Sequence, residues 1–217
     1  VHHPTGRSDL AAWVADTAEI LSSIGASTLV VGCPFDAAFE QFRAATGLLC
    51  LRLDELATAT AGRVVTLDES RMAFLQLTSG STGRPRAVTI SYRNIDANMR
   101  AMQIASETDA GRDMTVSWMP LFHDMGMMGF LIYPTYHAMN AVVVTPPDFL
   151  SDPLLWPTLI DRYRGTMTAA PNFAYDVVAR RLQQAAPGSL DLSCLRFALT
   201  GGEWIDPATL NRFLAAG

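Results

Sequence analysis

The chain carries the stretch LTSGSTGRPRAVTIS at residues 77–91, and this stretch is the strongest guide to its fold. Its polar residues, 78–86, lie between two apolar runs that are typical of strands, residues 72–77 and 87–90. Glycine lets backbone N–H groups approach an anion closely, and serine and threonine hydroxyls add further donors. The pattern therefore predicts a phosphate-binding loop between two strands, formed by Thr78, Ser79, Gly80, Ser81, Thr82 and Gly83.

Other glycine-rich loops are excluded by the residues present. A Walker loop ends in Gly-Lys-Ser/Thr, and this chain has no lysine, so all 16 of its basic residues are arginine. A dinucleotide fingerprint needs a glycine where Thr82 stands. A hydrolase elbow needs a glycine two residues before its serine, which neither Ser79 nor Ser81 has. A flexible polar turn stays open as the simpler alternative.

The amino-acid composition limits the classes of protein to which the chain can belong. The 217 residues are 49% hydrophobic and 17% charged, which is the balance of a soluble globular protein. The net charge of −5 comes without any basic stripe, so we expect no nucleic-acid partner. The most apolar stretch, residues 125–145, is interrupted by Pro134, His137 and Asn140, so it predicts a helix and a buried strand and no membrane span.

The three cysteines, Cys33, Cys50 and Cys194, are odd in number and far apart. We interpret them as buried thiols in a reducing compartment, with no metal site and no disulfide framework, and expect a cytoplasmic protein. The chain begins at Val1, and a helical pattern runs almost to its last residue. Both features suggest a piece of a longer polypeptide.

Apolar runs alternate with helical patterns along the whole chain. Ser8 and Asp9 precede a helical pattern over residues 10–24, which Gly25 is placed to end. Further helices are predicted at residues 36–44, after Ser91, at 173–184 and from Asp206. Strands are predicted at residues 27–31, 48–51, 72–77, 87–90, 115–118, 141–144, 166–169 and 195–199. This alternation indicates an α/β fold with mostly parallel sheets flanked by helices. The best candidate for a boundary between parts of the chain is residues 58–70. We therefore expect one portion at residues 1–70 and an ATP- and acyl-binding portion at 71–217.

Residues 78–86, TSGSTGRPR, resemble the phosphate-binding signature of the adenylate-forming superfamily, which includes acyl-CoA synthetases, luciferases and peptide-synthetase adenylation domains. The chain departs from it at Arg86, where the family usually has lysine. Arginine keeps the charge and offers a fork to phosphate oxygens. The resemblance implies that the loop holds the β- and γ-phosphates of ATP, supplied with Mg²⁺, and that Arg86 acts in catalysis.

Residues 118–129, WMPLFHDMGMMG, are similar to the second core motif of that superfamily, in the form typical of fatty acyl-AMP ligases. The resemblance implies that His123 acts between the substrate carboxylate and the phosphate, and that Asp124 orients it without binding metal. Outside this context, a histidine beside an aspartate is more often a structural pair. The apolar residues 125–133 fit either an acyl tunnel or plain core.

Two later segments extend the resemblance. Residues 199–213, LTGGEWIDPATLNRF, match the family's Gly-x-Glu in Gly201, Gly202 and Glu203, which implies an adenine site, although Trp204 replaces the usual proline. Residues 169–181, AAPNFAYDVVARR, look like a segment of the acyl-AMP ligases near the acyl and nucleotide pocket.

The implied reaction is ATP-dependent activation of a fatty acid to acyl-adenylate with release of pyrophosphate. The expected acceptor is an acyl carrier protein or the carrier domain of a polyketide or peptide synthase. Two alternatives stay open: an acyl-CoA synthetase that uses CoA, and a fragment that binds nucleotide or acyl chain without turnover. Because the family's later motifs and its C-terminal catalytic domain are absent from these residues, we expect the chain alone to be inactive or poorly active.

Overall fold

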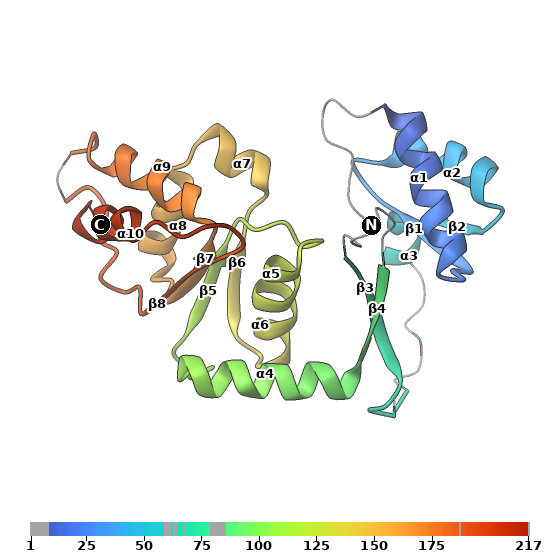
Figure 1. The fold of residues 1–217 in the computed structure, drawn as a ribbon, viewed down its shortest axis with the longest axis horizontal. Coiled ribbons are helices and arrows are strands. Elements are labelled where there is room, and N and C mark those ends of the chain that lie inside the picture. Colours follow the sequence, from blue (N-terminus) through green and yellow to red (C-terminus); the bar gives the residue numbers. More distant parts are fainter. Residues whose placement is uncertain are drawn as a thin grey trace. The chain divides into compact units, whose positions relative to one another are not determined.

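The structure is a computed structural model that describes residues 9–58, 62, 65–66, 68–78, 86–186 and 188–216. The chain divides into two compact units, Val1–Ile95 and Asp96–Gly217. Helix α4 (Tyr92–Ser106) contains the point of division (Figure 1). The sequence predicted a separate boundary near residue 70, before the ATP- and acyl-binding portion, and this boundary stays a prediction.

Part of the first unit is a small α/β layer. Strands β1 (Thr28–Val31) and β2 (Leu49–Arg52) pair in parallel, with Thr28 opposite Leu49. Helix α1 (Leu10–Ser23) starts where the Asp9 carboxylate accepts the Ala11 N–H at 2.9 Å. The remaining elements are η1 (Asp36–Ala38), α2 (Phe39–Thr46) and α3 (Leu53–Ala57). The buried core of this layer is Val14, Val31, Ala38, Phe39 and Phe42.

The same unit contains an antiparallel hairpin of β3 (Met72–Thr78) and β4 (Arg86–Ser91). Thr78 pairs with Arg86 at the end of the ladder, so the predicted phosphate loop connects these two residues. Ser79, Gly80, Ser81, Thr82 and Gly83 lie outside the described residues. After β4, the Ser91 hydroxyl accepts the Asn94 N–H at 3.2 Å, as expected of the residue that starts α4.

The second unit is built on a four-stranded parallel sheet in the order β6-β5-β7-β8. Its strands are β5 (Met114–Ser117), β6 (Asn140–Val143), β7 (Met167–Ala170) and β8 (Phe197–Thr200). Parallel neighbours need crossover connections, which the helices supply. These are α5 (Asp124–Gly126), the π-helix η2 (Met127–Ile132), α6 (Tyr133–Tyr136), α7 (Pro146–Ser151), α8 (Leu155–Tyr163) and α9 (Asn172–Leu182), and α10 (Pro207–Ala216) follows β8 (Figure 1).

Aromatic residues form the centre of the core in this unit. Trp118 stacks on Phe149 with ring centroids 4.0 Å apart, and Trp156 meets Tyr175 edge to face at 5.2 Å. Trp156 and Tyr175 are fully buried, and the Trp156 indole donates to the Thr168 hydroxyl at 2.9 Å. This packing fixes the carboxyl ends of β5 and β7, where open parallel sheets usually bind ligands.

The α/β class with parallel sheets flanked by helices is confirmed, with one antiparallel hairpin added. Strand β7 is buried along its length, whereas the edge strand β6 is largely exposed and β1 is exposed at Thr28 and Val30. All three cysteines are free, but Cys50 and Cys194 are only partly buried and Cys33, which follows β1, is exposed, so the expectation of buried thiols was wrong for Cys33. No helix within the described ranges is long and apolar enough to cross a membrane.

Candidate active site

The motif at residues 118–129 folds into a tight turn at the carboxyl end of β5. The Ser117 hydroxyl accepts the Met119 N–H at 3.0 Å, and the Pro120 carbonyl accepts the His123 N–H at 3.1 Å. A Cβ on Gly126 would lie 2.2 Å from the Pro120 oxygen, far inside van der Waals contact. The glycine of this motif is therefore needed for the first turn of α5 to pack against the loop that precedes it.

His123 is fixed through one ring nitrogen. Its Nδ1 lies 3.2 Å from the Met125 nitrogen and 2.8 Å from Oδ1 of Asp124. Unprotonated Nδ1 accepts the Met125 N–H, and protonated Nδ1 donates to Asp124. The histidine and aspartate side chains are 47% and 70% exposed, so the imidazole is accessible to a ligand. Both arrangements engage Nδ1 and leave Nε2 available for another group.

The glycine-rich segment after β8 is joined to the start of α9. Oε1 of Glu203 accepts the Phe173 N–H at 2.7 Å, and Oδ1 of Asn172 accepts the Asp206 N–H at 3.1 Å. The first N–H groups of a helix lack partners within the helix, and here the Glu203 carboxylate satisfies one of them. Two segments singled out from the sequence, residues 169–181 and 199–213, are thereby connected.

The turn after β5 also reaches the segment after β8. A Cβ on Gly201 would lie 3.5 Å from the methyl carbon of Met125, and one on Gly202 would lie 3.8 Å from it. Gly202 has a φ of 81°, in the left-handed region that favours glycine. The structure thus brings Gly201 and Gly202 close to Met125, in the motif that carries His123, at the carboxyl ends of β5 and β8.

An apolar cavity of about 240 Å³ lies in the second unit, next to this turn. Residues of the segment 125–133 form one wall, which favours the tunnel interpretation of that segment over plain core. The sequence did not point to the other walls, which come from α4 and from the strands β5, β7 and β8. The lining is Met102, Ala105, Ser106, Thr115, Met125, Met128, Gly129, Phe130, Tyr133, Met167, Thr168, Ala169, Phe197 and Leu199.

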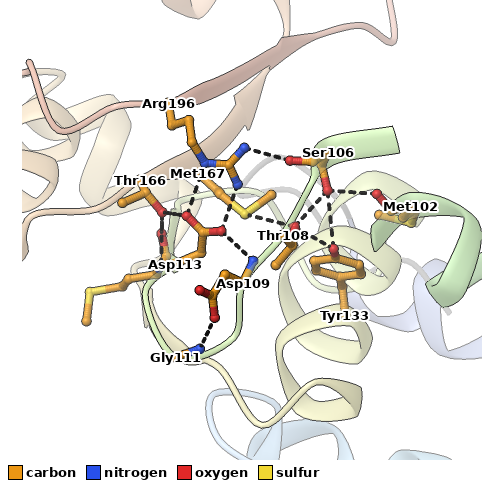
Figure 2. Close-up of polar contacts among 11 residues, drawn as sticks. Met102, Ser106, Thr108, Asp109, Gly111, Asp113, Tyr133, Thr166, Met167 and Arg196 are labelled. Atoms are coloured by element: carbon orange, nitrogen blue, oxygen red, sulfur yellow. Dashed lines mark hydrogen bonds and ion pairs between the residues drawn. The ribbon is translucent and has the colours of Figure 1, made fainter. Parts of the chain in front are cut away.

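A polar cluster borders the cavity at the ends of α4 and β5 (Figure 2). The Tyr133 hydroxyl donates to Thr108 Oγ1 at 2.7 Å, and the hydroxyls of Ser106 and Thr108 are also 2.7 Å apart. Beside them, Arg196 Nη1 donates to the Ser106 carbonyl at 2.6 Å. Both Ser106 and Tyr133 line the cavity, so this cluster holds part of its wall.

Asp113 is the buried charge of this cluster. Burial pushes the pKa of its carboxyl up, but hydrogen bonds from Arg196, the Asp109 N–H and Thr166 outweigh burial, so the pKa is lowered. Asp113 is therefore an anion paired with a guanidinium. Sequence reasoning missed the pair because 83 residues separate its members.

The predicted ATP-binding residues of the hairpin belong to the first unit. Thr78 and Arg86 pair across the base of the loop, and the Arg86 side chain is exposed. His123, Gly201, Gly202 and Glu203 belong to the second unit. The roles assigned to all of these residues stay predictions. Within the described part of the chain, no group of three or more His, Cys, Asp or Glu side chains could hold a metal ion.

A sequence model described as AMP-binding enzyme matches residues 14–217. The chain belongs to the AMP-binding enzyme family. The turn with His123, the glycine-rich segment 199–213 and the hairpin loop are thus parts of an AMP-binding enzyme, as their resemblance to the adenylate-forming superfamily implied.

Individual relatives of this AMP-binding enzyme are ligases. A Mycobacterium tuberculosis protein named as a ligase, Rv1013, is 47% identical over 218 residues, which cover 100% of this chain and 40% of that protein. The long-chain-fatty-acid–AMP ligase FadD23 of the same species is 39% identical over 65% of this chain and 25% of its own length. A medium-chain-fatty-acid–[acyl-carrier-protein] ligase of Teredinibacter turnerae is 38% identical over 66% of this chain and 22% of its own length.

Solved structures with a fold similar to that of this chain also include fatty acyl-adenylate ligases. A structure from work on fatty acyl-adenylate ligases of E. coli and L. pneumophila superposes with a TM-score of 0.85 at 32% identity, covering 100% of this chain and 40% of that one. The L. pneumophila fatty acyl-adenylate ligase in complex with acyl adenylate and pyrophosphate gives a TM-score of 0.82 at 27% identity, covering 95% and 36%. The AMP-binding enzyme chain therefore spans less than half the length of these proteins.

Proposed function

We propose that the polypeptide carrying this chain activates a fatty acid with ATP, forming acyl-adenylate and pyrophosphate. The observation that carries the proposal is the apolar cavity beside the His123 turn, because Met125 both lines the cavity and approaches Gly201. A chain of methylene groups fits such a lining, and its carboxylate would emerge at the turn. Relatives named as fatty-acid–AMP ligases support the same reaction.

In the proposed reaction, a carboxylate oxygen attacks the α-phosphorus of ATP, and the bond from that phosphorus to the bridging oxygen of pyrophosphate breaks. Two anions must meet, so the main tasks of the protein are to position them and to stabilise their charge. His123 would meet the reacting oxygens through Nε2, while either the Met125 N–H or the Asp124 carboxylate holds Nδ1. Gly201, Gly202 and Glu203 would form the adenine side of the site.

The hairpin loop would hold the pyrophosphate end of ATP. Thr78, Ser79, Gly80, Ser81, Thr82 and Gly83 would donate backbone and hydroxyl hydrogens to the β- and γ-phosphates, and Arg86 would offset their charge. Mg²⁺ would arrive with ATP, since it is usually bound by substrate phosphates with only one or two carboxylates.

For the acceptor of the acyl group we propose an acyl carrier protein or a synthase carrier domain in the cytoplasm. The Teredinibacter turnerae relative is named for transfer to acyl carrier protein, and the three free cysteines fit a reducing compartment. Transfer to CoA is the alternative, and a thioester of CoA among the products would favour it.

We also propose that this chain is an incomplete catalytic domain, since it spans about 40% of the first relative. The residues beyond it would complete the adenine and magnesium sites. A non-catalytic fragment that binds nucleotide or acyl chain is the competing interpretation for the isolated chain.

The test is fatty-acid-dependent exchange of labelled pyrophosphate into ATP, measured on this chain and on the native-length polypeptide with acids of several lengths. We expect exchange in the longer protein and little or none in the chain alone. Sustained acyl-adenylate formation by the chain would refute the proposed incompleteness. If neither protein exchanges with any acid, fatty-acid activation is the wrong function.

A further inference from the structure

The apolar cavity of the second unit runs along the strands of the sheet. Met167 of β7 lies opposite Phe197 of β8, and Ala169 lies opposite Leu199. All four residues line the cavity, in agreement with the alternation of side chains along a strand. Ala169 and Leu199 lie toward the carboxyl ends of the strands, where the His123 turn follows β5. Met167 and Phe197 begin their strands, and we call this pair the inner level of the cavity.

Polar residues close the sheet just beyond the inner level. Asp113, Thr166 and Arg196 immediately precede β5, β7 and β8. Thr166 Oγ1 donates to Asp113 Oδ1 at 2.8 Å, and Arg196 Nη2 donates to Asp113 Oδ2 at 2.7 Å. Arg196 also donates to the Ser106 carbonyl at the end of α4 (Figure 2). Hydrogen bonds therefore join three strands and one helix at the amino ends of the strands.

Met167 lies between the cavity and this polar cluster. The residue lines the cavity, and its sulfur accepts the Thr108 hydroxyl at 3.5 Å (Figure 2). Thr108 accepts the Tyr133 hydroxyl at 2.7 Å and is not part of the cavity lining. A hydrocarbon chain that went deeper would have to displace Met167 and break hydrogen bonds between buried polar groups. Such a step is unfavourable, because the separated groups would be left unsatisfied.

Resting on the proposed function, we propose that Met167 and Phe197 form the closed inner end of the acyl site and set an upper limit on the length of the acid. Each methylene group that enters the apolar cavity favours binding. A methylene group that meets the inner level must instead displace packed side chains, which is unfavourable. Longer acids should therefore be rejected more sharply than shorter ones.

The volume of the cavity gives the expected length. A cavity of roughly 150 Å³ takes up benzene, so about 240 Å³ holds roughly ten non-hydrogen atoms at the same density. The substrate class is therefore unsubstituted acids of medium length, with about ten carbons, whose methyl end meets Met167 and whose carboxylate lies at the His123 turn.

The experiment measures pyrophosphate exchange by the native-length polypeptide with the saturated acids from butanoic to octadecanoic acid. We expect kcat/KM to rise with chain length as far as decanoate or its neighbours in the series. It should then be about tenfold or more lower for tetradecanoate, because the additional methylene groups have no room. Values that keep rising, or stay level, as far as octadecanoate would overturn the inference.

Two substitutions of Met167 test the inner end directly. Met167→Ala removes Cγ, Sδ and Cε, so the optimum should move to acids that are longer by about two carbons. Met167→Leu conserves the volume of the core better and should fold even if the alanine variant does not. Because its side chain is shorter than that of methionine, the optimum should move by about one carbon, which acids with odd numbers of carbons can resolve. An optimum that is unchanged in the folded variants would overturn the inference.

Met128→Ala is the matched control. Met128 lines the cavity from η2, between Met125 at the His123 turn and Tyr133 at the polar cluster. The substitution removes the same atoms as Met167→Ala, but from the side of the cavity instead of its inner level. It should leave the optimum near decanoate. A shift equal to that of Met167→Ala would mean that total volume sets the length, and the assignment of Met167 would be wrong.

Failure of this inference is distinguishable from failure of the proposed function. If acids are activated without an upper limit on length, or if neither change at Met167 moves the limit, the inner end is wrongly assigned and fatty-acid activation stands. If no acid supports exchange, the proposed function is wrong. The thermal shift that each acid produces then decides the question of length. A largest shift near decanoate that moves to longer acids in Met167→Ala supports the inference, and the same optimum in both proteins contradicts it.

Discussion

Arg196 holds the buried carboxylate of Asp113 through two hydrogen bonds, from Nε to Oδ1 at 3.2 Å and from Nη2 to Oδ2 at 2.7 Å. The same guanidinium donates to the Ser106 carbonyl at the end of α4 (Figure 2). Asp113 immediately precedes β5, and Arg196 immediately precedes β8. One side chain therefore ties together the helix and the strands that form walls of the cavity.

Replacing Arg196 by methionine should destabilise the protein by about 3 kcal/mol, because it leaves the fully buried Asp113 carboxylate without its cation. Urea unfolding measures this change. Arg180→Gln is the control, because Arg180 is largely exposed and its partner Asp176 also has Arg212. It should cost less than about 1 kcal/mol. Equal losses of stability in the two variants would show that the buried pair of Arg196 and Asp113 contributes no more than an exposed ion pair.

The pH dependence of the Arg196 variant should also differ from that of the parent protein. The folded pKa of Asp113 is lowered, so the stability it contributes is present above its unfolded pKa and is lost as pH falls through the folded value. Without Arg196, burial would raise that pKa. The stability difference between the parent and Arg196→Met should therefore be largest near neutral pH and shrink in acid. A difference that grows as the pH falls would contradict the pairing.

Gly126→Ala should disrupt the His123 turn, since its Cβ would lie 2.2 Å from the Pro120 carbonyl oxygen and backbone atoms would have to move. We expect a loss of stability of about 2 kcal/mol or more and a loss of pyrophosphate exchange. Gly129→Ala is the matched change in the same segment, and its Cβ meets no atom within 4 Å. Its stability should stay within about 1 kcal/mol of the parent. Thermal unfolding of both variants provides the comparison.

His123→Ala should lower kcat of pyrophosphate exchange by about a hundredfold or more, if its ring stabilises the reacting oxygens as proposed. Asp124→Asn should have a smaller effect, about tenfold, because the Met125 N–H still holds Nδ1. His137→Gln is the control: its ring packs against Tyr133 and Tyr136 and takes no part in the proposed reaction. Exchange that persists in His123→Ala would remove this residue from the mechanism.

If the acyl chain occupies the cavity as we propose, Gly129→Leu should restrict the protein to shorter acids. Gly129 lines the cavity, and the space next to its Cα is open, so a leucine side chain can occupy room otherwise used by the substrate. We expect the optimum of kcat/KM to move to shorter acids by several carbons, with kcat for the shortest acids retained. An unchanged length profile would mean that the acyl chain runs elsewhere.

The sequence was a good guide where the signal is local. The periodic apolar residues and Gly25 predicted α1 to within a residue, and the apolar runs predicted the eight strands of the described residues to within about two residues. Helices α7 and α8 were not predicted, because both contain prolines near their starts and α7 has six residues. The antiparallel pairing of β3 and β4 was also not predicted, although residues 78–86 are too few for the crossover that parallel strands need.

Contacts between distant residues could not be predicted from the chain alone. Asp113 and Arg196 are ordinary charged residues until the sheet places their strands side by side. Thr115 belongs to the strand MTVS, in which only the fold decides which polar side chain finds a partner. The motif residues His123, Gly201 and Glu203 were found because their pattern is local. The cavity could be recognised only in the folded structure, because its walls come from strands that are distant in the sequence.

The π-helix Met127–Ile132 allows the wall of the cavity to change by one residue without disturbing the helix that follows. Its hydrogen bonds span one residue more than those of an α-helix, as in the bond from the Tyr133 N–H to the Met128 carbonyl. Because the wider turn takes up the extra residue, deleting one residue here would restore the ordinary α-helical pattern and leave the direction of the following side chains unchanged. An insertion or deletion of one codon, and not only a substitution, is therefore a route by which evolution can reshape this cavity, in which we propose that the acyl chain lies.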